Sequence, residues 1–204
     1  MHDAIVTRGR LAPGQTILFQ GASSGQGLMG MQFARAKGAK LVIGTSTNAD
    51  RRARLAEFGA DMALDSRDET WVDQVLEATG GVGVAVTIDM LSGYAANQTM
   101  AATKVNGYIV NVGRLGGSTG EFDFNLHALR RINYIGVTGR TRTVEESGEI
   151  ARLTHTDTDI WDALAAGTIV TPIDSVFALE DARAALDRMA ANEHFGKIVL
   201  SVGA

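Results

Sequence analysis

The chain alternates short runs rich in β-branched residues with longer runs that suit helices. Strands are predicted at residues 16–20, 41–45, 62–65, 84–89, 108–112 and 134–138. Helices are predicted between them, at residues 25–37, 49–58, 70–78, 93–103 and 126–131. The run at 84–89 is almost wholly apolar, as expected for a strand covered on both faces. Strands separated by helical crossovers predict an α/β fold with a six-stranded, parallel, doubly wound sheet.

The pattern changes toward the C-terminus. Residues 143–166 are predicted to be helical, with an interruption around 154–158 where Thr and Asp cluster. After Pro172 an extended segment at 176–177, a helix at 180–192 and a strand at 197–202 are predicted. We therefore expect a main domain over residues 1–170 and a helix-strand appendage over 171–204.

Composition narrows the classes of protein that fit. The chain has 204 residues and a formal charge of −4, which disfavours a general nucleic-acid binder. It has no Cys, which excludes disulfides, Cys-based zinc sites and thiol nucleophiles, and makes the cytoplasm the expected compartment. The longest uncharged stretch, 11–34, contains Pro, Ser, Gln and Gly and does not read as a membrane span, and no apolar signal segment is recognised.

The strongest local signal is a glycine-rich turn, QGASSGQGL at residues 20–28, between the first predicted strand and helix. A dinucleotide pyrophosphate needs a tight turn, backbone without a Cβ beside it, and a helix N-terminus pointing at its charge. Gly25 and Gly27 give that backbone access. The G-x-G-x-x-G fingerprint is imperfect, because Ala22 and Ser24 occupy its first two glycine positions. A structural turn without a ligand is the alternative.

The same turn fits G-x-x-x-G-x-G, the pattern of short-chain dehydrogenases. Those enzymes require a catalytic Tyr-x-x-x-Lys, and no tyrosine of this chain is followed by Lys four positions later. That alternative is excluded.

The end of the second predicted strand bears on the choice of cofactor. NAD enzymes place an acidic residue there for the ribose 2′-hydroxyl, but no carboxylate occurs before Asp50, which already enters the next helix. Hydroxyls at Ser46 and Thr47, with Arg51 or Arg52 behind them, suit a 2′-phosphate instead. Cations in the first turn of a helix oppose its dipole, which favours a nearby anion. The sequence therefore favours NADP(H) over NAD(H); the alternative is that both arginines are merely solvated.

No metal site is predicted. The four histidines, His2, His127, His155 and His194, show no ligand spacing, and there is no Cys to assist them.

Five segments together resemble the cofactor-binding half of a medium-chain dehydrogenase/reductase. They are GQTILFQGASSGQG; LAEFGADMALD with ATGGVGVAVTIDMLSG; GYIVNVGRLGG; YIGVTGRTRTVEE; and HFGKIVL. The nearest similarity is to the zinc-independent quinone oxidoreductases and enoyl reductases, and it runs from about Arg8 to Val202. It implies a Rossmann fold.

The resemblance also implies where the cofactor lies. It assigns Ser24, Gly25, Gln26 and Gly27 to the pyrophosphate; Ser46, Thr47 and Arg51 to the 2′-phosphate; Val112, Gly113 and Arg114 to the nicotinamide ribose; and Gly196 and Lys197 to the far side of the cofactor. Arg140 to Arg142 would approach the nicotinamide end or a subunit contact. Two residues depart from the family pattern: Gln26 replaces a usual Val, and Gly139 stands where a bulky side chain is common.

In this family a GroES-like domain precedes the Rossmann fold and carries most of the substrate pocket, and this chain shows no counterpart. No catalytic residue is therefore assigned. Apolar side chains of the tail beyond Pro172, which pack on that domain in relatives, would need to repack on the Rossmann body, swap between subunits, or be disordered.

The leading hypothesis is an NADPH-dependent oxidoreductase that transfers hydride to a quinone, enone or aldehyde, or its nucleotide-binding fragment. The alternatives are a non-catalytic NADP(H)-binding or redox-sensing module, and a truncated product without a function of its own. The strand at 134–138 is expected at the edge of the sheet, where relatives dimerise, so the resemblance implies a homodimer. Neither nucleic acid nor membrane is an expected partner.

Overall fold

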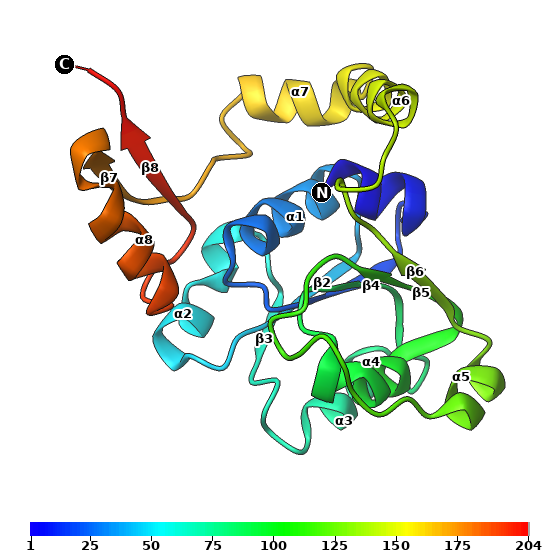
Figure 1. Ribbon diagram of the computed structural model, residues 1–204. Helices are drawn as coiled ribbons and strands as arrows, with labels where there is room; N and C mark the ends of the chain where they lie inside the picture. The colour runs from blue at the N-terminus through cyan, green and yellow to red at the C-terminus, as the bar shows by residue number, and fades with distance from the viewer. Residues whose placement is uncertain (204) are drawn as a thin grey trace.

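The computed structural model describes residues 1–203 and contains a large sheet and a small one (Figure 1). All six strands of the large sheet run parallel, in the order β3-β2-β1-β4-β5-β6. They are β1 (Thr16–Gln20), β2 (Leu41–Thr45), β3 (Met62–Leu64), β4 (Val84–Asp89), β5 (Thr103–Asn111) and β6 (Asn133–Gly136). The strand order reverses between β1 and β4, and the predicted doubly wound sheet is confirmed. At such a reversal the loops after the two strands leave on opposite faces, which opens a crevice at their carboxyl ends.

Helices cover both faces of this sheet (Figure 1). One face carries η1 (Asp3–Arg8) and α1 (Gly25–Ala36), and the other carries α3 (Trp71–Ala78), α4 (Ala96–Ala102) and α5 (Phe124–Arg130). The remaining elements before the tail are α2 (Ala49–Ala53), η2 (Leu55–Phe58), η3 (Gly93–Ala95), α6 (Val144–His155) and α7 (Thr158–Ala165).

Alternation along β1 shows how the sequence builds two cores. Ile17 and Phe19 pack with η1 and α1, whereas Leu18 packs with Trp71 and Val75 of α3 on the other face. All of these side chains are fully buried. Successive side chains of a strand point to opposite faces, so a strand covered on both sides is apolar throughout. The position of β1 in the centre of the sheet follows from this pattern.

Two predicted elements of the main domain differ most from the structure, and one predicted break is confirmed. The helix expected over 49–58 is two pieces, α2 and the 3₁₀ turn η2, and Gly59 ends the second piece with a left-handed φ of 92° as expected. Strand β5 begins at Thr103 rather than at 108, because α4 ends at Ala102 and the chain extends at once. The interruption predicted around 154–158 is confirmed as the break between α6 and α7.

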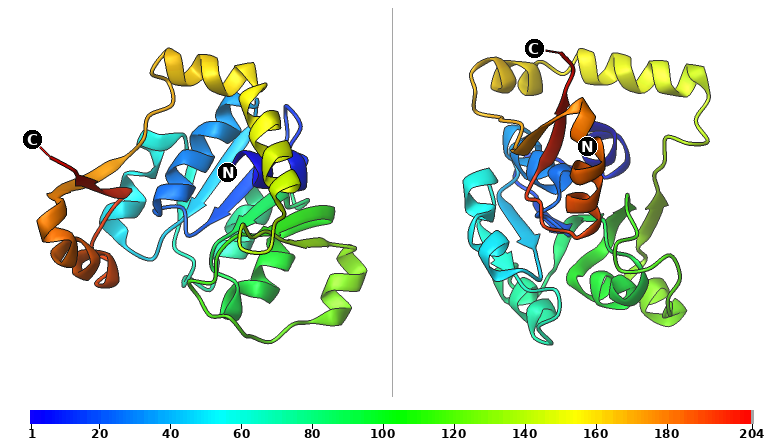
Figure 2. Two further views of the ribbon diagram at one scale, coloured as in Figure 1. Left: turned by 45° about the horizontal axis from the view of Figure 1, so that its top comes forward. Right: turned by 60° about the vertical axis from the view of Figure 1, so that its left-hand side comes forward.

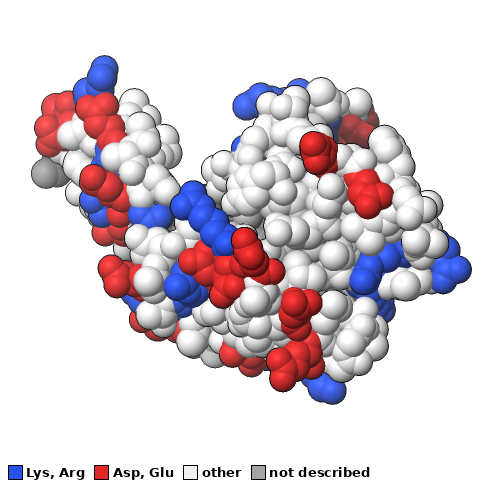
Figure 3. Space-filling model, turned by 90° about the horizontal axis from the view of Figure 1, so that it is seen from below, with Lys and Arg blue, Asp and Glu red and all other residues white. Residues whose placement is uncertain are grey.

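The C-terminal segment forms a unit of its own beside the large sheet (Figure 2). It consists of the parallel pair β7 (Ile173–Ala178) and β8 (Lys197–Ser201), the turn η4 (Leu179–Asp181) and the helix α8 (Ala182–Ala190). Figure 3 shows this unit as a separate lobe that carries charges of both signs. Several of its apolar side chains remain exposed, among them Ile173, Val176, Leu186 and Met189.

The unit touches the main domain at one end. Phe195 is buried between the ring of Phe58, at a centroid distance of 5.6 Å, and the guanidinium of Arg54, 4.2 Å from its ring centroid. An isolated backbone bridge joins Ser24 to Gly196. These contacts place the start of β8 directly over the start of α1.

Candidate functional site

The first turn of α1 lies at the carboxyl edge of the sheet and forms the centre of the candidate site. Ser24 caps the helix, because its Oγ accepts a hydrogen bond from the Gly27 N–H at 3.1 Å. The Oγ of Ser24 also donates to the sulfur of Met90, at 3.2 Å, and so links the loops that follow β1 and β4. No acidic side chain lies in the first turn of α1, so the positive end of the helix dipole is not neutralised there.

Close packing requires glycine at position 27 and leaves little room for a side chain at position 25. A Cβ on Gly27 would lie 2.4 Å from the Ala22 carbonyl oxygen, so only glycine lets the helix begin against that turn. A Cβ on Gly25 would lie 2.9 Å from the side-chain carbons of Lys197. The structure therefore brings Ser24, Gly25, Gly196 and Lys197 together and sets a lysine side chain across the helix N-terminus. Gln26 is exposed beside them.

The end of β2 supplies the second group of predicted residues. Ser46 is buried and its Oγ donates to the Oγ of Ser23 at 3.1 Å, which ties the β2 turn to the glycine-rich turn. Thr47 is exposed. Among residues 1–203, Arg51 forms no ion pair with a carboxylate; its guanidinium donates to Asn192 instead. Arg52 bonds the Ser46 carbonyl at 2.8 Å and the Asp65 carboxylate at 3.1 Å.

The sequence left open whether Arg51 or Arg52 would bind a 2′-phosphate, and their different partners favour one of them. The charge of Arg52 is neutralised by Asp65, whereas that of Arg51 is not balanced by a neighbouring acid. Arg51 is therefore the better candidate to meet an anion.

The loops after β4 and β5 are held by a buried network that sequence reasoning did not assign. Asp89, at the end of β4, accepts hydrogen bonds from the Leu91 and Ser92 N–H groups, each at 2.9 Å. Ser92 has a left-handed φ of 56° and donates to the Gly113 carbonyl at 2.8 Å. Asn111 also donates to the Ser92 Oγ. The network fixes Gly113 beside Met90; Val112 and Arg114 flank Gly113 in the same loop.

Tyr134 of β6 completes this network. Its hydroxyl donates to the other carboxylate oxygen of Asp89 at 3.3 Å. Burial, together with the adjacent Asp89 charge, raises the pKa of Tyr134 to about 12. A cavity of about 300 Å³ lies alongside, lined in part by Tyr134, Arg114 and Phe122. An acidic residue that ends a central strand was the sequence signal that could have revealed Asp89.

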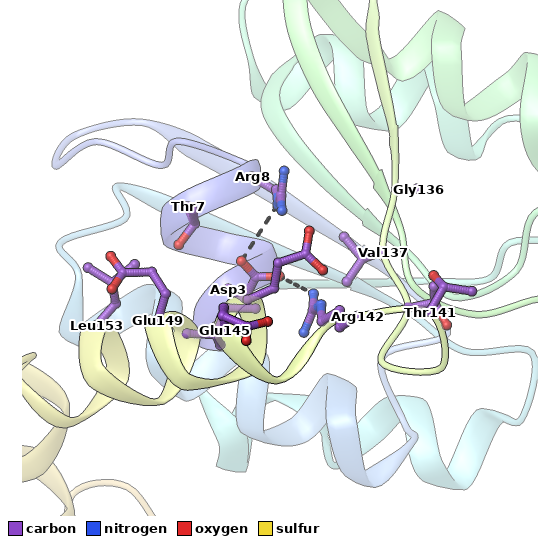
Figure 4. A pocket seen from close by; sticks show the side chains of 13 residues that line it. Asp3, Thr7, Arg8, Gly136, Val137, Thr141, Arg142, Glu145, Glu149 and Leu153 are labelled. Atoms are coloured by element: carbon purple, nitrogen blue, oxygen red, sulfur yellow. Dashed lines mark hydrogen bonds and ion pairs between the residues drawn. The ribbon is translucent and has the colours of Figure 1, made fainter.

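The segment after β6 does not join the glycine-rich turn. Arg140 is exposed, with its backbone N–H bonded to Thr138. Arg142 donates to the buried carboxylate of Asp3 in η1 at 2.5 Å, and Arg8 approaches the same carboxylate (Figure 4). These residues line a cavity of about 510 Å³ between η1, β6 and α6. Arg142 therefore links the segment just before α6 to η1.

The described residues, 1–203, contain no cluster of three or more metal-ligating side chains, so they do not fit a bound zinc ion. Within that range no helix is both apolar enough and long enough to cross a lipid bilayer.

A family model described as zinc-binding dehydrogenase matches residues 25–154, which is more than half of the chain. This chain belongs to the zinc-binding dehydrogenase family. It corresponds to the cofactor-binding domain of the medium-chain dehydrogenase/reductase superfamily, as its sequence predicted. The zinc in the family description has no ligand cluster within residues 1–203.

Named relatives agree with this assignment. The chain is 30% identical to the highly reducing polyketide synthase dmxL2 of Cryptosporiopsis sp., over 98% of its own length and 8% of the synthase. It superposes on a quinone oxidoreductase of Pseudomonas syringae pv. Tomato with a TM-score of 0.78 and 25% identity, over 95% of this chain and 58% of that one.

A mycobacterial protein, Rv1454c, solved in complex with NADPH, shares the fold with a TM-score of 0.82 at 24% identity, over 98% of this chain and 60% of that one. The chain thus spans less than a tenth of the synthase and about three fifths of each of these two solved chains.

Proposed function

We propose that this chain is the NADPH-binding domain of an oxidoreductase of the quinone or enone reductase type. The observation that carries the cofactor choice is the end of β2. Ser46, Thr47 and an arginine without an acidic partner follow that strand, where an NAD enzyme would present a carboxylate. The substrate class is supported by the similarity to a quinone oxidoreductase.

In this proposal, the N-terminus of α1 binds the pyrophosphate of the dinucleotide and the end of β2 binds its 2′-phosphate. The N-terminus of α1, with Gly25 and Gly27 beside it and the lysine side chain of Lys197 across it, provides a dipole, a close backbone approach and a cation for a pyrophosphate. Arg51 would meet the 2′-phosphate. Such a cofactor supplies hydride from its nicotinamide ring, and the protein supplies position.

In this proposal, the nicotinamide ring binds against the loop after β5. Ser92 and Asn111 hold the Gly113 carbonyl, and Asp89 holds Ser92 in its left-handed conformation. This loop is fixed before any ligand arrives, so little ordering entropy is lost when a ring binds against it.

The decisive experiment is a fluorescence titration of the chain with NADPH and NADH. Replacing Arg51→Glu should weaken NADPH binding by about tenfold or more, since a charge-assisted hydrogen bond is replaced by repulsion, and leave NADH affinity nearly unchanged. Lys40→Glu is the matched control, because Lys40 is exposed at the opposite end of β2. Equal affinity for both cofactors in the wild type would refute the NADPH assignment.

Turnover separates the enzyme from the second candidate, a non-catalytic NADP(H)-binding module. Oxidation of NADPH with phenanthrenequinone as acceptor supports the reductase. Tight cofactor binding with no turnover above a buffer blank supports the module.

A further inference from the structure

Asn192, in the C-terminal unit, holds the guanidinium of Arg51. The Nη1 of Arg51 donates to the Asn192 Oδ1 at 3.1 Å, and the Nη2 donates to the Asn192 backbone carbonyl. Asn192 follows the last turn of α8 with a left-handed φ of 54°, which aims both acceptors at α2. The two residues are 141 positions apart in sequence and meet at the adenosine end of the proposed cofactor site.

Fixing the C-terminal unit in place does not require this contact. Phe195 already attaches the unit through Phe58 and Arg54, and Ser24 pairs with Gly196. The other arginines of α2 and its C-cap have partners within the main domain: Arg52 bonds Asp65, and Arg54 bonds Glu57. Arg54 also contacts the C-terminal unit, through the ring of Phe195. Within residues 1–203, only Arg51 of the three hydrogen-bonds to that unit, and its partner there is a neutral amide, which leaves the positive charge intact.

We propose that Asn192 is a positioning residue that determines cofactor choice by holding Arg51 toward the 2′-phosphate. The proposal rests on the function proposed above. A free arginine side chain loses rotamer entropy when it grips a phosphate; one already held by two acceptors loses less. The guanidinium has five N–H donors, and those not engaged by Asn192 remain for the phosphate oxygens.

The test is the ratio of the NADH to the NADPH dissociation constant, measured by fluorescence titration of the full chain. Asn192→Gly keeps the left-handed backbone and the carbonyl but removes Oδ1, and should lower the ratio about threefold to tenfold through weaker NADPH binding. Asn192→Asp keeps the acceptor but neutralises Arg51, and should lower the ratio by about tenfold or more. Asn106→Gly, the same substitution at an exposed left-handed residue in β5, should leave the ratio unchanged.

A second measurement separates positioning from a structural role. In an Arg51→Ala background, Asn192→Gly should cause no further change in the ratio, because Asn192 acts only through Arg51. The proposal is overturned if the wild-type ratio survives within twofold in either Asn192 variant, or if Asn192→Gly lowers the ratio equally without Arg51. If the wild type binds NADPH and NADH equally well, both the NADPH assignment and the role of Asn192 are refuted. If the wild type prefers NADPH and the Asn192 variants prefer it to the same degree, only the role of Asn192 is refuted.

Discussion

At the scale of single residues, the chain places polar groups where parallel strands end. Asp89 accepts hydrogen bonds from two backbone N–H groups and from the hydroxyl of Tyr134, so hydrogen bonds add to apolar packing in holding the loops that it touches. Buried polar groups joined in this way rigidify a site, since any broken bond leaves an unsatisfied partner.

Tyr134 provides a test of this network by alkaline titration. Its pKa is raised from 10.0 to about 12, so between these values the unfolded chain releases the phenolic proton while the folded chain keeps it. Its contribution to stability is therefore complete below pH 10 and is lost as pH rises toward 12. We expect Tyr134→Phe to remove this part of the alkaline destabilisation, measured as the difference in urea midpoint between pH 9 and about pH 11.5. An unchanged pH dependence in Tyr134→Phe would contradict the assignment.

The glycine-rich turn and the residues after β2 could be found from the sequence, because their neighbours in space are neighbours in the chain. Gly27 is obligatory against Ala22, only five positions earlier, and the motif records that requirement. Asn192 could not be found this way. Its partner Arg51 is on another element, and an Asn after a helix is equally typical of a simple C-cap.

At the scale of elements, α6 and α7 are held to the start of the chain and to the end of α1 by ion pairs. Asp157, just before α7, accepts from Lys37, the residue after α1, at 3.0 Å and from His2 at 2.9 Å. Burial alone would raise the pKa of Asp157, but the hydrogen bonds from Lys37 and His2 outweigh it and lower the pKa. The cluster of Thr and Asp predicted the break before α7. It did not predict that Asp157, within the break, forms a salt bridge.

The lowered pKa of Asp157 has a consequence in acid. The stabilisation is present above the unfolded pKa of an aspartate and is lost as pH falls through the lower, folded value. Asp157→Asn should therefore reduce the melting temperature at pH 7 while making stability less sensitive to acid below about pH 4. Thermal unfolding followed by circular dichroism at both pH values measures this, with Asp162→Asn on the exposed face of α7 as the control. Parallel pH profiles for wild type and Asp157→Asn would count against it.

Phe195 attaches the C-terminal unit, and its removal should release that unit. Phe195→Ala eliminates the edge-to-face contact with Phe58 and the cation–π contact with Arg54, a loss of about 3 kcal/mol for a buried aromatic. We expect faster cleavage by thermolysin or proteinase K in the linker at residues 166–172, while the main domain persists as a resistant fragment. Phe177→Ala, within β7, is the comparison variant. If both variants are cleaved at the wild-type rate, Phe195 is not the attachment point.

At the scale of the whole molecule, β6 is an edge strand, as the sequence pattern predicted. Its outer hydrogen-bonding groups are available to a second strand, and self-pairing would create a two-fold dimer. The homodimer stays a prediction. Strand alternation reveals how many strands a sheet has, but which copy or segment covers an edge depends on association energies that no local pattern records.

Light scattering at micromolar concentration tests the dimer. The wild type should show about twice the 21.6 kDa of one chain. Gly136→Lys should give a folded monomer, because a Cβ at Gly136 meets nothing within 4 Å in the single chain, whereas a lysine there obstructs strand pairing. A wild-type monomer would exclude this interface, and a dimeric Gly136→Lys would place it elsewhere.

The pairing of β1 with β4 divides the main sheet into two blocks of consecutive strands. Gly80 and Gly81 connect these blocks in a turn with open space around both residues. If the chain were cut at this turn, β1 and β4 would become exposed edge strands of two separate sheets, and each would pair with the other in the native arrangement. Two separately expressed halves should then reassemble on mixing. Recovery of nucleotide binding in the crevice between β1 and β4, where the cofactor is proposed to bind, would show that they have done so.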